Sequence, residues 1–238
     1  MNETAPNVSS NIHREIVFEE HIVGCLVREQ GYVERRCSEH YDVSLALDKD
    51  LLFRFLKDTQ PDAWQSLESY YSASAENELL KRLEQALRNQ PTHKVLRDDL
   101  CLVPNIRFSL CHFKPASDLN PDLTRFYEGN ILSVMRQVAY SSKNKNTIDI
   151  VIFVNGIPVA TIEVKNHLTG QTFRHAEEQY RWNRSPAGEP LLTFKRGAIV
   201  HFAVDQNNVS MATHLISRSG ERSGEPWYSG RESSRLSL

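Results

Sequence analysis

The clearest chemistry in this 238-residue sequence comes from three charged residues in two apolar runs. Asp149 lies inside a β-branched run, and Glu163-Val164-Lys165 ends the next one. Glu163 and Lys165 are two residues apart, so in a strand they would project from the same face. Charged groups in apolar strands need partners, because burying them unpaired is costly. Two carboxylates and one ammonium group could hold a hard divalent cation such as Mg²⁺ and support phosphodiester hydrolysis.

The position of Asp149 depends on the turn at Asn155-Gly156, a sequence that favours a β-hairpin. A two-residue loop alone would place Asp149 opposite Ile162 and would turn Glu163 to the other face. A longer loop or a β-bulge would place Asp149 directly across from Glu163. We predict the second register, because bulges gather beside active sites. The simpler alternative is a surface ion pair on an exposed hairpin.

These residues, with a preceding helix that carries Glu19, resemble the PD-(D/E)xK nuclease superfamily. Longer stretches between residues 12 and 215 are more specifically similar to the N-terminal endonuclease region of the type I restriction enzyme R (HsdR) subunit. The similar stretches are residues 59–64 (TQPDAW), 134–141 (VMRQVAYS), 148–166 (IDIVIFVNGIPVATIEVKN), 177–181 (EEQYR) and 197–205 (GAIVHFAVD).

The resemblance implies an α/β fold, with a PD-(D/E)xK nuclease-like core whose central mixed β-sheet is flanked by helices, plus extra N-terminal helices. It also implies Mg²⁺-dependent cleavage of double-stranded DNA, with Mn²⁺ as a possible substitute, and assembly with modification and specificity subunits. In that family, ATP-driven helicase domains follow the nuclease. This sequence contains no GxxxxGK[ST] loop, so we expect ATP binding only in a longer, full-length protein.

The same resemblance assigns roles to individual residues. Asp149 and Glu163 match the metal-binding carboxylates, and Lys165 matches the catalytic lysine. Glu19 matches the acidic residue of the first helix, with its neighbour Glu20 as the alternative.

A further catalytic assignment by resemblance is Gln179, which matches the glutamine of a QxxxY element. The tyrosine position of that element is occupied here by Asn183, so Tyr180 or Trp182 would have to compensate. Both aromatic residues are equally compatible with ordinary packing.

Residues 143–201 form the basic part of the chain, with 8 basic and 5 acidic side chains. This distribution favours a polyanionic partner. The expected contacts to DNA phosphates are Lys143, Lys145, Arg174, Arg181 and Arg184, and the alternative for each is a solvated surface charge. Near the site, we expect Arg136 and Gln137 to make structural hydrogen bonds.

Hydrophobic periodicity predicts the elements that position these residues. We expect helices at residues 11–30, 49–57, 61–71, 75–89 and 173–183, and strands at 106–113, 131–140, on both sides of Asn155-Gly156, and at 198–204 and 209–213. The expected organisation is a flexible N-terminus (1–11), an endonuclease domain (12–215) and a disordered or truncated tail (216–238).

Composition excludes several other classes of protein. The 40% hydrophobic and 24% charged residues are typical of a globular protein, and no apolar run is long enough to span a membrane. The four cysteines lack CxxC spacing, which favours a reducing cytoplasm. Two alternatives to a type I restriction endonuclease module remain. One is a stand-alone repair or resolvase-like nuclease, and the other is a noncatalytic docking module.

Overall fold

A mixed β-sheet is the centre of the molecule. The computed structural model describes residues 8–102, 105–117, 119–166, 170–215 and 227–231. Within these residues, seven strands pair in the order β1-β6-β7-β8-β9-β10-β11. They span Val33–Arg36 (β1), Leu132–Ala139 (β6), Thr147–Val154 (β7), Ile157–Val164 (β8), Val200–Val204 (β9), Asn208–Ala212 (β10) and Trp227–Arg231 (β11). β1 is parallel to β6 and β8 is parallel to β9, whereas the other neighbours are antiparallel.

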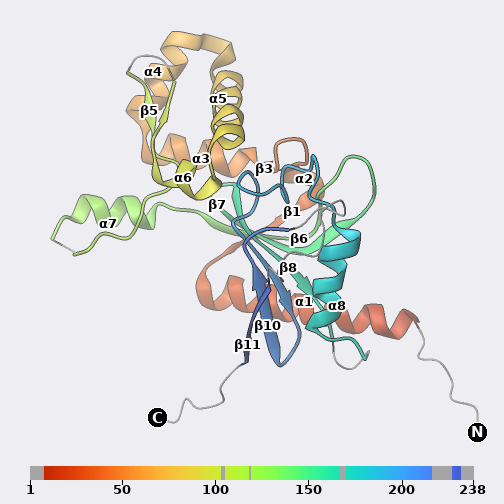
Figure 1. Cartoon of the computed structure of the whole chain (residues 1–238). Helices are drawn as coiled ribbons and strands as arrows, with labels where there is room; N and C mark the ends of the chain where they lie inside the picture. Colours follow the sequence, from red (N-terminus) through yellow and green to blue (C-terminus); the bar gives the residue numbers. More distant parts are fainter. Residues whose placement is uncertain (1–7, 103–104, 118, 167–169, 216–226, 232–238) are drawn as a thin grey trace, which may run out of the picture.

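Helices cover both faces of this sheet (Figure 1). The long helix α1 (Val8–Gln30) packs its apolar side, including Val23, against Ile150 and Ile162. On the other face, α8 (Phe173–Glu178) continues into the π-helical turn η3 (Gln179–Asn183), and Tyr180 from η3 packs in the same cluster as Val151. Alternate residues of β7 therefore contact opposite helical layers, as the period of a strand requires.

A second group of helices has its own core. It comprises α3 (Lys49–Thr59), α4 (Pro61–Tyr71), α5 (Ala75–Asn89) and α6 (Thr92–Arg97), which pack around Leu52, Phe55, Leu67 and Leu83. In Figure 1 this group stands beside the end of the sheet. With it, the predicted fold class is confirmed: a mixed sheet flanked by helices, plus extra N-terminal helices.

Shorter elements complete the described part of the chain. They are α2 (Cys37–His40), β2 (Tyr41–Asp42), β3 (Leu47–Asp48), η1 (Ser72–Ser74), β4 (Leu100–Cys101), β5 (Arg107–Phe108) and α7 (Pro121–Glu128). None of the described helices combines the length and the apolar character that a membrane crossing requires.

The hairpin between β7 and β8 confirms the predicted register. Asn155 and Gly156 form the turn with φ values of 51° and 79°, as a two-residue hairpin loop requires. Phe153 pairs with Pro158 next to the turn, but Ile152 pairs with Ala160, so a bulge intervenes. The shifted pairing continues to Ile150 and Ile162, which brings Asp149 across from Glu163.

Several boundaries differ from the sequence-based expectations. The strand expected at 106–113 is only Arg107–Phe108, because the following backbone pairs with side chains such as Asn130 instead of a strand. Val8–Asn11 belong to α1 rather than to a flexible terminus, and residues 1–7 lie outside the described residues.

Within the segment expected to be a disordered or truncated tail, the structure describes one ordered stretch, Trp227–Arg231. These residues form β11, which pairs antiparallel with β10 and so extends the sheet by one strand. The rest of the expected tail, residues 216–226 and 232–238, lies outside the described residues.

Candidate active site

Asp149 and Glu163 meet at the end of the bulged hairpin. The backbone N–H of Val164 donates a 2.8 Å hydrogen bond to Oδ2 of Asp149. Glu163 is fully buried, and its Oε1 accepts a 2.8 Å hydrogen bond from Nε of Arg184. Burial raises the pKa of Glu163 well above its ordinary value, and the nearby charge of Asp149 raises it further, while Arg184 opposes both. Two carboxyl groups held this closely favour a cation between them.

The donor atoms of this pair suit a hard cation. Oε2 of Glu163 is buried and has no hydrogen-bond partner among the described residues. An orphaned carboxylate oxygen beside a second carboxylate fits Mg²⁺, which proteins commonly bind through one or two carboxylates and several waters. The described residues contain no group of three or more His, Cys, Asp and Glu that could hold a metal ion, so this fit rests on two carboxylates.

Lys165 lies next to an acidic residue that the sequence analysis missed. Its side chain is almost buried, and its Nζ lies 3.7 Å from Oε2 of Glu15 on α1. The backbone N–H of Lys165 donates to the carbonyl oxygen of Val204, which fixes the end of β8 against β9. Glu15 precedes Glu19 by four residues, so both occupy one helix face, and this spacing was the available signal.

The acidic residue of the first helix that faces the site is Glu19 rather than Glu20. Glu19 is buried, and both of its carboxylate oxygens lie 3.1 Å from Nε2 of Gln137. Burial, followed by the charge of Asp149, raises the pKa of Glu19 to about 7. Glu20 is exposed and pairs at 3.3 Å with Arg136.

Gln137 joins two of these carboxylates. Its Nε2 also lies 3.4 Å from Oδ1 of Asp149, while its Oε1 accepts a 2.7 Å hydrogen bond from the hydroxyl of Thr147. Gln137 has a φ of 49° inside β6, a left-handed conformation that is unfavourable for a residue with a side chain. The hydrogen bonds expected of Gln137 are present, and they tie α1 to the hairpin.

Gln179, the remaining catalytic residue assigned by resemblance, makes no described hydrogen bond to the carboxylates. Gln179 begins η3 and is partly exposed, and within the described residues no hydrogen bond joins it to Asp149, Glu163 or Lys165. Tyr180 is buried, with its hydroxyl 2.8 Å from Oγ1 of Thr161, and therefore belongs to the core.

The other two residues considered for the incomplete QxxxY element are also placed. Trp182 is exposed, and the backbone carbonyl of Asn183 accepts a hydrogen bond from the hydroxyl of Tyr140. Among the described contacts, neither the Trp182 nor the Asn183 side chain binds Asp149 or Glu163.

The expected DNA contacts divide into exposed and buried residues. Lys145 and Arg174 are exposed, and Lys143 is exposed while its Nζ lies 3.2 Å from Glu189. Arg181 is partly exposed and lies 4.0 Å from Glu177. Arg184 differs from the other four, because its side chain is buried and pairs with Glu163 instead of lying at the surface as a phosphate contact would require.

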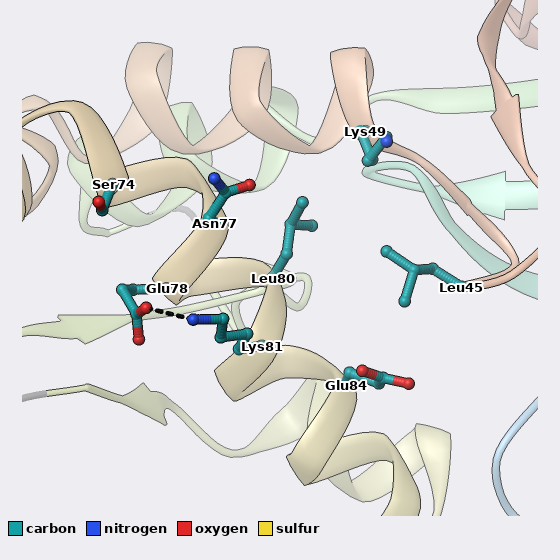
Figure 2. Close-up of a pocket in the computed structure, with 8 residues that line it drawn as sticks. All are labelled: Leu45, Lys49, Ser74, Asn77, Glu78, Leu80, Lys81 and Glu84. Atoms are coloured by element: carbon teal, nitrogen blue, oxygen red, sulfur yellow. Dashed lines mark hydrogen bonds and ion pairs between the residues drawn. The ribbon is translucent and has the colours of Figure 1, made fainter.

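One cavity lies away from the carboxylates, in the helical group. This cavity has a volume of about 370 Å³ and lies beside α5. Figure 2 shows Asn77, Leu80 and Glu84 on one side of it and Leu45 and Lys49 across from them. Glu78 and Lys81 form an ion pair of 2.6 Å at its rim. None of the predicted site residues lines this cavity, which is open to solvent, so it is a surface feature separate from the candidate site.

Comparison with known proteins adds the family. The sequence model of the family described as the type I restriction enzyme R protein N terminus matches residues 19–215. The matched range contains Glu19, Asp149 and Glu163, together with Lys165 and Arg184, but not Glu15. No curated protein matches the chain.

Proposed function

Because the chain belongs to the family of type I restriction enzyme R protein N-terminal regions, we propose that it is the Mg²⁺-dependent DNA endonuclease module of a type I restriction–modification enzyme. The observation that carries this proposal is that Asp149 and Glu163 lie across from each other on the bulged β7–β8 hairpin, with Lys165 two residues beyond Glu163. The orphaned oxygen of Glu163 supports a metal role for this pair. We interpret this pair of carboxylates as the metal site of a PD-(D/E)xK nuclease.

In this proposal Asp149 and Glu163 hold the ion. Mg²⁺ bound there, or Mn²⁺ in its place, would polarise a phosphoryl oxygen and lower the pKa of a water molecule. Lys165, whose Nζ lies 3.7 Å from Oε2 of Glu15, contributes a positive charge that would orient the attacking water or stabilise the negative charge that develops on the phosphate. Glu19 and Gln137 fix the position of Asp149 from the side of α1.

We propose that double-stranded DNA is the substrate and that it reaches the module through the ATP-driven motor domains of a full-length R subunit, in the cytoplasm. Modification and specificity subunits would supply sequence recognition. Within this chain, the candidates for phosphate contacts are the exposed residues Lys143, Lys145 and Arg174 and the partly exposed Arg181. Such contacts position DNA without reading its sequence.

Plasmid cleavage by the enzyme reassembled with its partner subunits tests the proposal. We expect Asp149→Asn, Glu163→Gln and Lys165→Met each to reduce cleavage by at least roughly 100-fold, as loss of a transition-state contact does, and to leave ATP hydrolysis intact. Lys81→Met is the matched control, since Lys81 is an exposed lysine paired with Glu78 on α5. Normal cleavage by the Lys165→Met enzyme would overturn the proposed chemistry.

A noncatalytic docking module is the second candidate. It is favoured by the lack, among the described residues, of a third His, Cys, Asp or Glu at the carboxylate pair. It is also favoured by α7, which buries none of its residues and exposes Leu123 and Tyr127. Calorimetric titration of the chain with Mn²⁺ separates the two functions: a docking module would show no binding that depends on Asp149 and Glu163.

A further inference from the structure

Arg184 is the basic residue that pairs with the fully buried Glu163 in the described structure. Its side chain is 9% exposed, and its Nε donates a 2.8 Å hydrogen bond to Oε1 of Glu163. The second carboxylate oxygen, Oε2, receives no hydrogen bond from the described residues. The two oxygens of Glu163 are therefore unequal: one is engaged by the guanidinium, and the other is left available beside Asp149.

The position of Arg184 is itself fixed by the surrounding structure. Arg184 directly follows η3, and its guanidinium carbon lies 5.7 Å from the ring centre of Tyr140, which follows the end of β6. The hydroxyl of Tyr140 donates a 3.1 Å hydrogen bond to the carbonyl oxygen of Asn183. One buried tyrosine thus holds both the backbone before Arg184 and the face of its guanidinium group.

We propose that Arg184 is a positioning residue, which holds Glu163 through Oε1 and leaves Oε2 free for a divalent cation shared with Asp149. This inference rests on the proposed function, because it assigns Arg184 a role toward the ion of that site. Arg184 touches neither substrate nor ion in this role. It acts through Glu163.

The charges of the site explain why an arginine suits this position. Removing one partner of a buried ion pair leaves an uncompensated charge, which is more costly than the pair itself. Arginine keeps its charge when buried and donates in a fixed plane, whereas the ammonium group of lysine is a point charge that fixes direction less well. A phosphate contact would need this guanidinium at the surface, where it does not lie.

The test measures Mn²⁺ affinity of the full 238-residue chain by calorimetry in the absence of DNA. We expect Arg184→Ala to weaken Mn²⁺ binding at least about tenfold, as loss of a residue that orients a ligand typically does. Arg184→Lys should recover part of this loss, and Tyr140→Phe should cause a smaller one. Arg88→Ala is the matched control, because Arg88 pairs with Glu84 at 2.7 Å on the exposed surface of α5. Circular dichroism verifies that each variant is folded.

Binding of a short DNA duplex without divalent metal, measured over a range of salt concentrations, provides the second readout. A positioning role leaves duplex affinity and its salt dependence unchanged in Arg184→Ala, whereas a phosphate contact lowers both. If the native chain binds Mn²⁺ and Arg184→Ala or the folded Arg184→Lys binds it equally well, the inference is wrong and the proposed function survives. If the native chain binds no Mn²⁺, both are wrong.

Discussion

At the residue scale, the candidate site concentrates negative charge in a buried region. Its acidic members are Glu15, Glu19, Asp149 and Glu163, and the cations that contact them are Arg136, Lys165 and Arg184. Burial is the largest cause of the raised pKa of Glu15, Glu19 and Glu163. The site is therefore electrostatically unfavourable until protons or a cation reduce the repulsion, which is a common property of functional sites.

Glu19 provides a direct test of this unfavourable charge. Its pKa is about 7 in the folded chain against an ordinary value of 4.5, so the folded state binds the extra proton between these pH values. Stability linked to Glu19 is thus present in full below pH 4.5 and is lost as pH rises through 7. Without metal, we expect Glu19→Gln to be more stable than the native chain at pH 8, by about 1–3 kcal/mol, and equally stable at pH 4.5.

Urea unfolding at a series of pH values measures this difference. The same substitution should lower cleavage in the assembled enzyme, because Glu19 and Gln137 hold Asp149 in position. A glutamine variant that is less stable than the native chain at pH 8 would show that the charge of Glu19 is well compensated in the fold.

The sequence identifies some of these residues and cannot identify others. Asp149, Glu163 and Lys165 stand out because charges within apolar strands are rare and need a reason. Arg184 looks like any other surface arginine, since its partner lies 21 positions away and is reached only through the turn that follows α8. The left-handed conformation of Gln137 has no sequence signal either, because glutamine rarely adopts it.

At the element scale, the β7–β8 hairpin carries both metal-binding candidates, and its turn is packed against the helical group. The backbone N–H of Asp48 donates a 2.9 Å hydrogen bond to the carbonyl oxygen of Gly156. The side chain of Asp48 in turn caps α3 through the N–H of Leu51 and pairs with Arg35 on β1. The turn therefore fixes the hairpin to α3 and, through Asp48, to the edge of the sheet.

The structure leaves no room for a side chain at Gly156. Its φ is 79°, and a Cβ atom there would overlap the carbonyl oxygen of Asp48 and crowd the backbone N of Leu52. We expect Gly156→Ala to destabilise the fold by at least roughly 3 kcal/mol, because both the backbone conformation and the packing are lost. Urea unfolding and the yield of folded protein measure the effect.

Gly31 is the matched control for this substitution. Its φ is 72°, but no atom lies within 4 Å of the position of an added Cβ. Gly31→Ala should therefore destabilise the fold only through its unfavourable left-handed backbone conformation, by on the order of 1 kcal/mol. Equal losses of stability in Gly156→Ala and Gly31→Ala would mean that the overlap of the added Cβ with Asp48 and Leu52 does not destabilise the fold.

Element prediction succeeds where one signal dominates. Asn155-Gly156 between β-branched runs specifies the hairpin, and α5 is predicted because its apolar residues recur at helical spacing. The apolar pattern predicts a strand at residues 106–113, but the strand formed is only Arg107–Phe108, because it pairs with the equally short β4. A polar, serine-rich context hides β11, whose stability comes from pairing with β10 rather than from its own sequence.

At the scale of the whole molecule, the site lies where three layers meet. Glu15 and Glu19 come from α1, Asp149 and Glu163 from the sheet, and Arg184 from the segment after η3. No single layer contains the site, so its geometry depends on packing across both faces of the sheet. A ligand that binds this junction also stabilises the fold by mass action, which links metal binding to melting temperature.

The outermost strand β11 contributes to the layer that carries Arg184. Trp227 is half-buried, and its ring centre lies 5.5 Å from that of Tyr180 in η3. A chain shortened to end at Leu215 would lose this contact and would expose the backbone of β10, whose Val209 and Met211 are already partly exposed. We expect it to be less stable by about 2 kcal/mol from the lost apolar burial.

Thermal unfolding and sedimentation measure the consequences of this truncation. A loss of this size lowers the melting temperature of a 200-residue chain by roughly 4–8 °C, and an unpaired edge strand promotes association between copies. A chain that ends at Arg231 keeps β11 and is the control, which should melt as the full chain does. If the chain ending at Leu215 melts at the same temperature and stays monomeric, β11 adds nothing to the sheet, and the layer that holds Arg184 is complete without it.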